Sequence, residues 1–230
     1  MPQVEKFPEA ARERFLGPAE FAALGEVLAK AERGEALVID KNGKPRSVKV
    51  SLRSVAAIRL LIFTGARHSE ILGLRREWID WNAGRANLPD SKTGKKPITQ
   101  PPAALEVLRG VDMPSDGKGF VIRGGDHSDP ERKLVNLKDP WGAVRGAAGL
   151  PDVRPHDLRP SFASVMAADG ASLLLIGKRL GHKDVKTTGR CAPLATDPLR
   201  VAADKVGERI ASQMKGQEGG AEIVPLHRKG

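Results

Sequence analysis

The chain has 230 residues, and its 38 lysines and arginines against 28 aspartates and glutamates give a formal net charge of +10. A surplus of this size favours a polyanionic partner, nucleic acid ahead of a membrane surface, although a solvated basic surface would give the same count. One cysteine excludes an internal disulfide. The sequence shows neither an apolar run of membrane-spanning length nor a signal-peptide pattern, so we predict a cytoplasmic protein that does not enter the membrane.

The N-terminal part of the chain predicts helices separated by a hairpin. Residues 1–12 are charged and weakly patterned, and we expect a linker or arm there. A proline at position 18 and apolar residues at helical spacing predict a helix that ends near Gly34. An Asn-Gly turn signal predicts a hairpin or an extended loop over 36–50, and Ser51 can cap a helix that ends at 64–65.

The central part of the chain predicts a small antiparallel sheet between helices. We expect short strands at 78–80, 85–88 and 96–99, joined by turns rich in Asn, Gly and Ser. The flanking segments are predicted as helices at 67–72, 101–109 and 140–148, with a short extended piece at 120–122.

The C-terminal part predicts four helices and a tail. The helices are expected at 157–168, 173–180, 184–191 and 198–214, and residues 215–230 are expected to be disordered because they are rich in glycine. The whole reads as one domain over 13–214, mainly α with a small three-stranded antiparallel sheet.

Basic residues in the C-terminal part suit the binding of an anion. His156 and Arg159 are three residues apart, a spacing that places two side chains on one face of a helix. His182 follows at the predicted end of the next helix and could close over the same anion. This arrangement favours a phosphate ligand.

Four ordered segments carry a family resemblance. They are residues 65–72 (GARHSEIL), 91–94 (SKTG), 156–159 (HDLR) and 180–182 (LGH). In this order they resemble the first arginine motif, the hairpin that carries the family lysine, the His-x-x-Arg box and the second histidine motif of the tyrosine recombinases, the phage integrase family. The resemblance covers residues 13–214 and implies the catalytic-domain fold of that family.

The resemblance also implies a chemistry for each residue. Arg67 and Arg159 would hold the non-bridging oxygens of a DNA phosphate, and Glu70 would orient the guanidinium of Arg67. Lys92 would protonate the departing 5′ oxygen as a general acid, while His156 and His182 would donate hydrogen bonds or assist proton transfer. The implied mechanism uses no metal, no nucleotide cofactor and no small-molecule substrate.

Each of these residues also has an ordinary structural interpretation. Taken alone, Arg67 and Lys92 would be surface cations. His156 would be a histidine at a helix entry, and His182 a residue favoured by a helix C-terminus. Only their joint order favours an inherited phosphate pocket.

The chain departs from the family pattern at the nucleophile. The family has a tyrosine in a run resembling Arg-Tyr-Ala-His-Leu, and here residues 190–194 read RCAPL, with no tyrosine anywhere in the chain. A thiolate at Cys191 could attack phosphorus if neighbouring cations lowered its pKa. The thiol is several ångström shorter than a tyrosine side chain, and we prefer the interpretation of Cys191 as a small buried hydrophobe.

Three hypotheses of function follow. The first is a site-specific DNA recombinase or integrase that acts through a covalent protein–phosphate intermediate and is impaired in cleavage. The second is a non-catalytic DNA-binding module that regulates an integrase or is its remnant, and the third is a basic interaction protein. Double-stranded DNA is the expected partner, with homo-oligomers forming only on DNA. Because the catalytic domain begins near Met1, without the family's usual N-terminal clamp, we expect weak site recognition.

Overall fold

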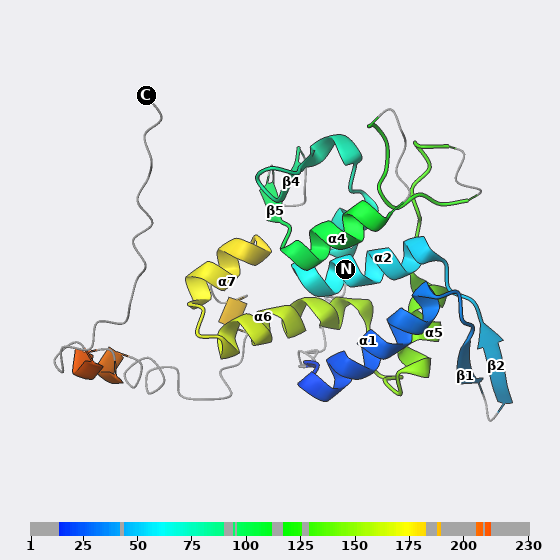
Figure 1. Ribbon diagram of the computed structural model, residues 1–230, viewed down its shortest axis with the longest axis horizontal. Helices are drawn as coiled ribbons and strands as arrows, with labels where there is room; N and C mark the ends of the chain where they lie inside the picture. Colours follow the sequence, from blue (N-terminus) through cyan, green and yellow to red (C-terminus); the bar gives the residue numbers. More distant parts are fainter. Residues whose placement is uncertain are drawn as a thin grey trace, which may run out of the picture.

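The computed structural model describes residues 14–41, 44–89, 94, 96–111, 117–125, 129–182, 188–189, 206–208 and 210–212. The elements follow one another in this order (Figure 1): α1 (Pro18–Glu32), β1 (Leu37–Lys41), β2 (Lys44–Val48), α2 (Leu52–Thr64), α3 (His68–Leu72), the 3-10 turn η1 (Arg76–Trp78), β3 (Ile79–Asp80), β4 (Arg85–Leu88), β5 (Lys96–Thr99), α4 (Pro102–Gly110), α5 (Lys138–Ala147), the 3-10 turn η2 (Pro155–Asp157), α6 (Leu158–Ala168) and α7 (Leu173–Leu180).

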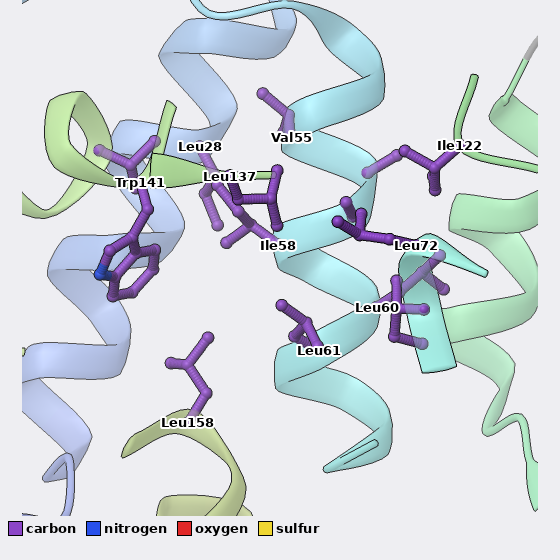
Figure 2. Close-up of a cluster of buried hydrophobic side chains, with 14 of the residues drawn as sticks. Leu28, Val55, Ile58, Leu60, Leu61, Leu72, Ile122, Leu137, Trp141 and Leu158 are labelled. Atoms are coloured by element: carbon purple, nitrogen blue, oxygen red, sulfur yellow. The ribbon is translucent and has the colours of Figure 1, made fainter. Parts of the chain in front are cut away.

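Helix α2 forms the centre of the domain. Its side chains are buried on almost every face, and it contacts α1, α4, α5 and α6. Figure 2 shows its leucine, isoleucine and valine side chains meeting those of the surrounding elements, with Leu28 on one side and Ile122 on the other. The hydroxyl of Ser51 accepts a hydrogen bond from the Ser54 N–H and caps the helix, as the sequence predicts. The C-terminal end of this largely buried helix lies at the candidate site.

The three-stranded sheet has the order β3–β4–β5, and both strand pairs are antiparallel. Ala86 in the central strand lies opposite Ile79 on one side and Ile98 on the other, and all three are buried. These three buried residues share one face of the sheet, which therefore packs on the core. The prediction of three short strands is confirmed, except that Trp78 belongs to η1, because its N–H bonds the carbonyl of Arg75 in a tight turn.

The segment predicted as a hairpin or an extended loop forms an antiparallel hairpin, β1–β2, which packs on α5. Helix α5 begins two residues earlier than predicted, at Lys138. In its first turn, the indole N–H of Trp141 donates to the carbonyl of Val153 at 2.9 Å and ties the helix to the loop that follows α5.

Helices α6 and α7 form a helical pair with a small core of its own. Ala163 from α6 packs with Ile176 and Leu180 from α7, apart from the main core. Ser172 caps α7 by accepting from the Leu175 N–H, and Gly181 ends it with a φ of 70°, in the left-handed region. Both boundaries agree with the prediction.

The predicted fold class, mainly α with a small three-stranded antiparallel sheet, is confirmed. The predicted arm at 1–12, the tail at 215–230 and most of the helices expected at 184–191 and 198–214 lie outside the described residues. Within the described part of the chain, no helix combines the length and the apolar character that crossing a membrane requires.

Candidate phosphate-binding site

The C-terminal ends of α2 and α7 meet the first turn of α6, and Arg159 joins all three. Arg159 is only 5% exposed. Its Nη1 donates to the carbonyl of Gly65 at 2.7 Å and its Nη2 to the carbonyl of Leu180 at 2.5 Å. The last carbonyls of a helix have no partner within the helix and carry partial negative charge, so a guanidinium satisfies them well. The cation is thus held by backbone atoms that are 94 and 21 residues away in sequence.

Arg67 lies beside this junction, in the loop between α2 and α3. Its Nη1 donates to Oε1 of Glu70 at 2.9 Å, and its Nη2 lies 3.4 Å from the carbonyl oxygen of Gly181. The other oxygen of Glu70 accepts the Arg67 backbone N–H, which caps the start of α3. The carboxylate orients the guanidinium, as the sequence predicts for Glu70. Because Arg67 and Arg159 bond to the carbonyls of Gly181 and Leu180, two neighbouring residues, their guanidiniums lie together.

A third cation comes from the sheet. Lys96, the first residue of β5, places its Nζ 2.7 Å from Oε1 of Glu70, the same oxygen that bonds Arg67. Burial lowers the pKa of the Lys96 ammonium below its usual range, although Glu70 opposes this effect. Burial also opposes ionisation of Glu70, but the hydrogen bonds from Lys96 and Arg67 outweigh it and hold the pKa of the carboxyl below its usual range.

His182 follows Gly181 and faces these cations. Burial and the charges of Arg159, Arg67 and Lys96 lower the pKa of His182 to about 4. Its Nδ1 lies 3.1 Å from the hydroxyl of Thr188, a fully buried side chain. The ring is therefore neutral at pH 7 and fixed in orientation, and it offers one N–H as a donor.

Two glycines make this junction possible. Gly65 has a φ of 61°, and a Cβ there would lie 2.6 Å from the ring of Phe162 on α6. A Cβ on Gly177 would lie 2.7 Å from the Thr188 hydroxyl that holds His182. Such short contacts require the neighbouring groups to move, so α6 and the Thr188 segment approach this closely because both positions are glycine.

Comparison with known proteins identifies the chain. Residues 26–195 match the phage integrase family. The chain belongs to that family. Tyrosine recombinase XerC of Pseudomonas aeruginosa (strain LESB58) is 32% identical over 145 residues, which are 60% of this chain and 46% of that protein. Tyrosine recombinase XerC of Pseudomonas fluorescens is 32% identical over 72% of this chain and 56% of its own length.

The chain thus spans about half the length of these XerC relatives. It spans almost all, 97%, of a putative integrase/recombinase from Sinorhizobium fredii, at 28% identity over 195 residues. Among solved structures, XerA recombinase matches with a TM-score of 0.61 at 19% identity, covering 88% of this chain and 67% of that one. XerH bound to its difH substrate matches with a TM-score of 0.60 at 18% identity, over 87% and 57% of the two chains. These likenesses confirm the predicted fold of phage integrase catalytic domains.

The structure brings some residues of the phage integrase motifs together and not others. Arg67, Glu70, Arg159 and His182 lie together at the junction. His156 lies in η2, one turn before Arg159, with an exposed side chain, and not on α6 itself. Lys92 and Cys191 lie outside the described residues. The catalytic roles implied for these residues therefore stay predictions.

Sequence reasoning missed Lys96 and Thr188. The family motif drew attention to Lys92, four residues before Lys96, and no local pattern shows that position 96 faces Glu70. The strand alternation was the available signal, because Lys96 lies on the same face of β5 as buried Ile98. Thr188 had no signal, since its role depends on contact with Gly177 and His182.

We expect the low pKa of His182 to appear as a dependence of stability on pH. An unfolded histidine titrates near about 6.5, whereas the folded ring takes up a proton only near pH 4. Between these values the unfolded chain binds more protons, so stability falls as the pH falls from about 6.5 toward 4.

The measurement is urea denaturation of the wild type and of His182→Gln at several pH values. The wild type should lose more stability than the variant across this window. His68, whose pKa burial also lowers, is present in both proteins, so their difference isolates His182. Parallel curves would contradict the expectation.

Proposed function

We propose that the chain binds duplex DNA through a backbone phosphate held in the pocket of Arg67, Arg159 and His182, as the catalytic part of a site-specific tyrosine recombinase. The observation that carries this proposal is the meeting of three cations, Arg67, Lys96 and Arg159, around a neutral histidine and one shared carboxylate. Two guanidiniums and a neutral N–H donor suit the oxygens of a phosphodiester. The net charge of +10 supports a nucleic-acid partner.

The geometry supports a division of roles within the pocket. A guanidinium has five N–H donors. The donors of Arg67 that bond Glu70 and Gly181 fix the plane of the group. The guanidinium keeps its full positive charge, which can attract an incoming anion. Arg159 is held by two carbonyls and adds a second fixed charge. Donors fixed in advance lose little freedom when the transition state forms, which makes them effective in phosphoryl transfer.

We propose further that strand cleavage is impaired, because Cys191 occupies the position of the nucleophile. In the implied reaction a tyrosine oxygen attacks phosphorus, a protein–phosphate bond forms, and the 5′ oxygen leaves with a proton from a lysine. A thiol reaches less far than a phenol, and misplacement of the nucleophile strongly reduces the rate. The same substitution favours the alternative, a DNA-binding module without cleavage that regulates an active integrase or is its remnant.

A covalent-capture assay on nicked duplex DNA tests both forms of the proposal. We expect the wild type to bind duplex with steep salt dependence and to form no covalent adduct. We expect Cys191→Tyr to form a protein–DNA adduct that survives denaturing electrophoresis. The control is Cys191→Phe, which has the ring of tyrosine and no nucleophilic oxygen.

The outcomes separate the hypotheses. An adduct with Cys191→Tyr alone supports an impaired recombinase, and an adduct with the wild type shows that the thiol itself reacts. Salt-dependent binding without an adduct in any variant supports the non-catalytic module. Binding that does not change between low and high salt contradicts a phosphate pocket in every form.

A further inference from the structure

Lys96 occupies a position where the sheet would ordinarily carry an apolar side chain. It pairs with Leu88 across β4 and β5, and it shares a face of β5 with Ile98, which is 3% exposed. The side chain of Lys96 is itself only 14% exposed. A charged group with so little access to water is costly unless a partner compensates it.

The partner of Lys96 is the carboxylate that also orients Arg67. Oε1 of Glu70 lies 2.7 Å from Lys96 Nζ and accepts from Arg67 Nη1 at 2.9 Å. Glu70 is 6% exposed, so its negative charge acts at short range on the two cations. The position of Arg67 thus depends on a carboxylate that is also bound by Lys96 of the sheet.

The end of α7 is shaped around the same ammonium group. A Cβ on Gly181 would lie 3.3 Å from Lys96 Nζ and equally close to its Cδ, tighter than ordinary van der Waals contact. Lys96 therefore lies against the backbone whose carbonyl contacts Arg67 and whose next residue is His182.

We propose that Lys96 is a positioning residue of the phosphate pocket, which fixes the guanidinium of Arg67 through the shared carboxylate of Glu70 and supplies one of the positive charges that face His182. The proposal rests on the proposed function of this pocket. It is distinct from the role implied for Lys92, because Lys96 acts through Arg67 and His182 and not on the leaving oxygen.

The proposal explains why this position carries a charge. A buried ion pair adds little stability compared with apolar residues of the same shape, so stability alone would favour a hydrophobic residue next to Ile98. The charged groups that face His182 come from three segments, namely Arg67 before α3, Lys96 on β5 and Arg159 on α6. Because the His182 ring is neutral, it adds no charge of its own, and the positive charges of Arg67, Lys96 and Arg159 remain available to attract a phosphate.

The test compares Lys96→Met and Lys96→Arg with the wild type by NMR of the His182 ring. In Lys96→Met we expect the pKa of His182 to rise from its value of about 4, because one of the charges that oppose its protonation is gone. Titration with inorganic phosphate, followed on the same resonance, should show an affinity roughly 10- to 100-fold weaker, the range seen when residues that orient metal ligands are removed. Lys96→Arg keeps the charge and should keep both readouts near the wild type.

Lys178→Met is the matched control. It removes the same charge from an exposed position on α7, four residues before His182, and should change neither readout appreciably. If Lys96→Met shifts the His182 pKa and the phosphate affinity no more than Lys178→Met does, the proposal is wrong.

A wild type that binds neither phosphate nor duplex would refute the proposed function, and the His182 pKa would still decide whether Lys96 sets the local charge. If Lys96→Met does not fold, loss of phosphate affinity in folded Lys96→Arg would overturn the proposal, because charge alone would not restore the role.

Discussion

Replacing Arg159 by methionine is expected to lower the free energy of unfolding by about 3 kcal/mol, because hydrogen bonds to a charged group contribute about 1.5–3 kcal/mol each and buried acceptors are costly when left unpaired. The side chain is 5% exposed and bridges the carbonyls of Gly65 and Leu180. Methionine fills a similar volume and has no N–H, so it leaves both carbonyls without this donor. Guanidinium denaturation at pH 7 measures the change.

Arg154→Met is the control for this experiment, because Arg154 lies five residues earlier with an exposed side chain. Its effect should stay within about 0.5 kcal/mol, as for most surface substitutions. Arg159→Lys keeps the charge, but one ammonium cannot reproduce the fork of a guanidinium, and we expect an intermediate loss. Equal losses in Arg159→Met and Arg154→Met would show that the bridge does not hold α2, α6 and α7 together.

Replacing Glu70 by alanine is expected to destabilise the protein by about 3–5 kcal/mol, the range for removing one partner from a buried ion pair. Arg67 and Lys96 would lose the carboxylate that both contact, and Lys96 is 14% exposed. An added anion should then replace part of the lost charge. We therefore expect inorganic phosphate to raise the melting temperature of Glu70→Ala more than that of the wild type, since a ligand that binds only the folded state stabilises it.

The control is Glu35→Ala, which breaks an ion pair with Arg33 of 2.6 Å at the surface, where both side chains are about half exposed. Exposed pairs contribute roughly 0–1 kcal/mol, so the loss should be small, and the response to phosphate should match that of the wild type because the pocket is unchanged. The melting temperatures are measured in phosphate and in chloride at equal ionic strength, which separates specific anion binding from screening. A Glu70→Ala protein that responds to phosphate no more than Glu35→Ala would argue against a phosphate pocket beside Arg67.

The sequence predicted those parts of the fold whose signals are local. Ser172 and Gly181 mark the two ends of α7 in both the prediction and the structure. Their signals are local, because a side-chain cap and a left-handed residue act within one helical turn. Trp78 was assigned to the wrong element, because the bend at η1 leaves no mark in the strand alternation.

The candidate site was predictable only where a motif marked it. Glu70 lies three residues after Arg67, and their contact follows from helical spacing. Lys96 reaches the same carboxylate from another element, and only the register of β5 against β4 places it there. The carbonyls of Gly65 and Leu180 carry no side-chain signal at all, since any residue supplies a carbonyl and only the packing of the helices decides which ones meet Arg159.

The small core between α6 and α7 has a consequence for the lifetime of the pocket. Three fully buried side chains, Ala163, Ile176 and Leu180, hold α7 on the domain, whereas α2 is enclosed by the main core. Segments with few buried apolar contacts open at lower free energy than the domain as a whole. Leu180, Gly181 and His182 all belong to the α7 end. A local opening would withdraw the carbonyls that accept from Arg159 and Arg67, and the His182 ring with them, while the main core stays closed. We therefore expect the pocket to assemble and come apart with the docking of one short helix.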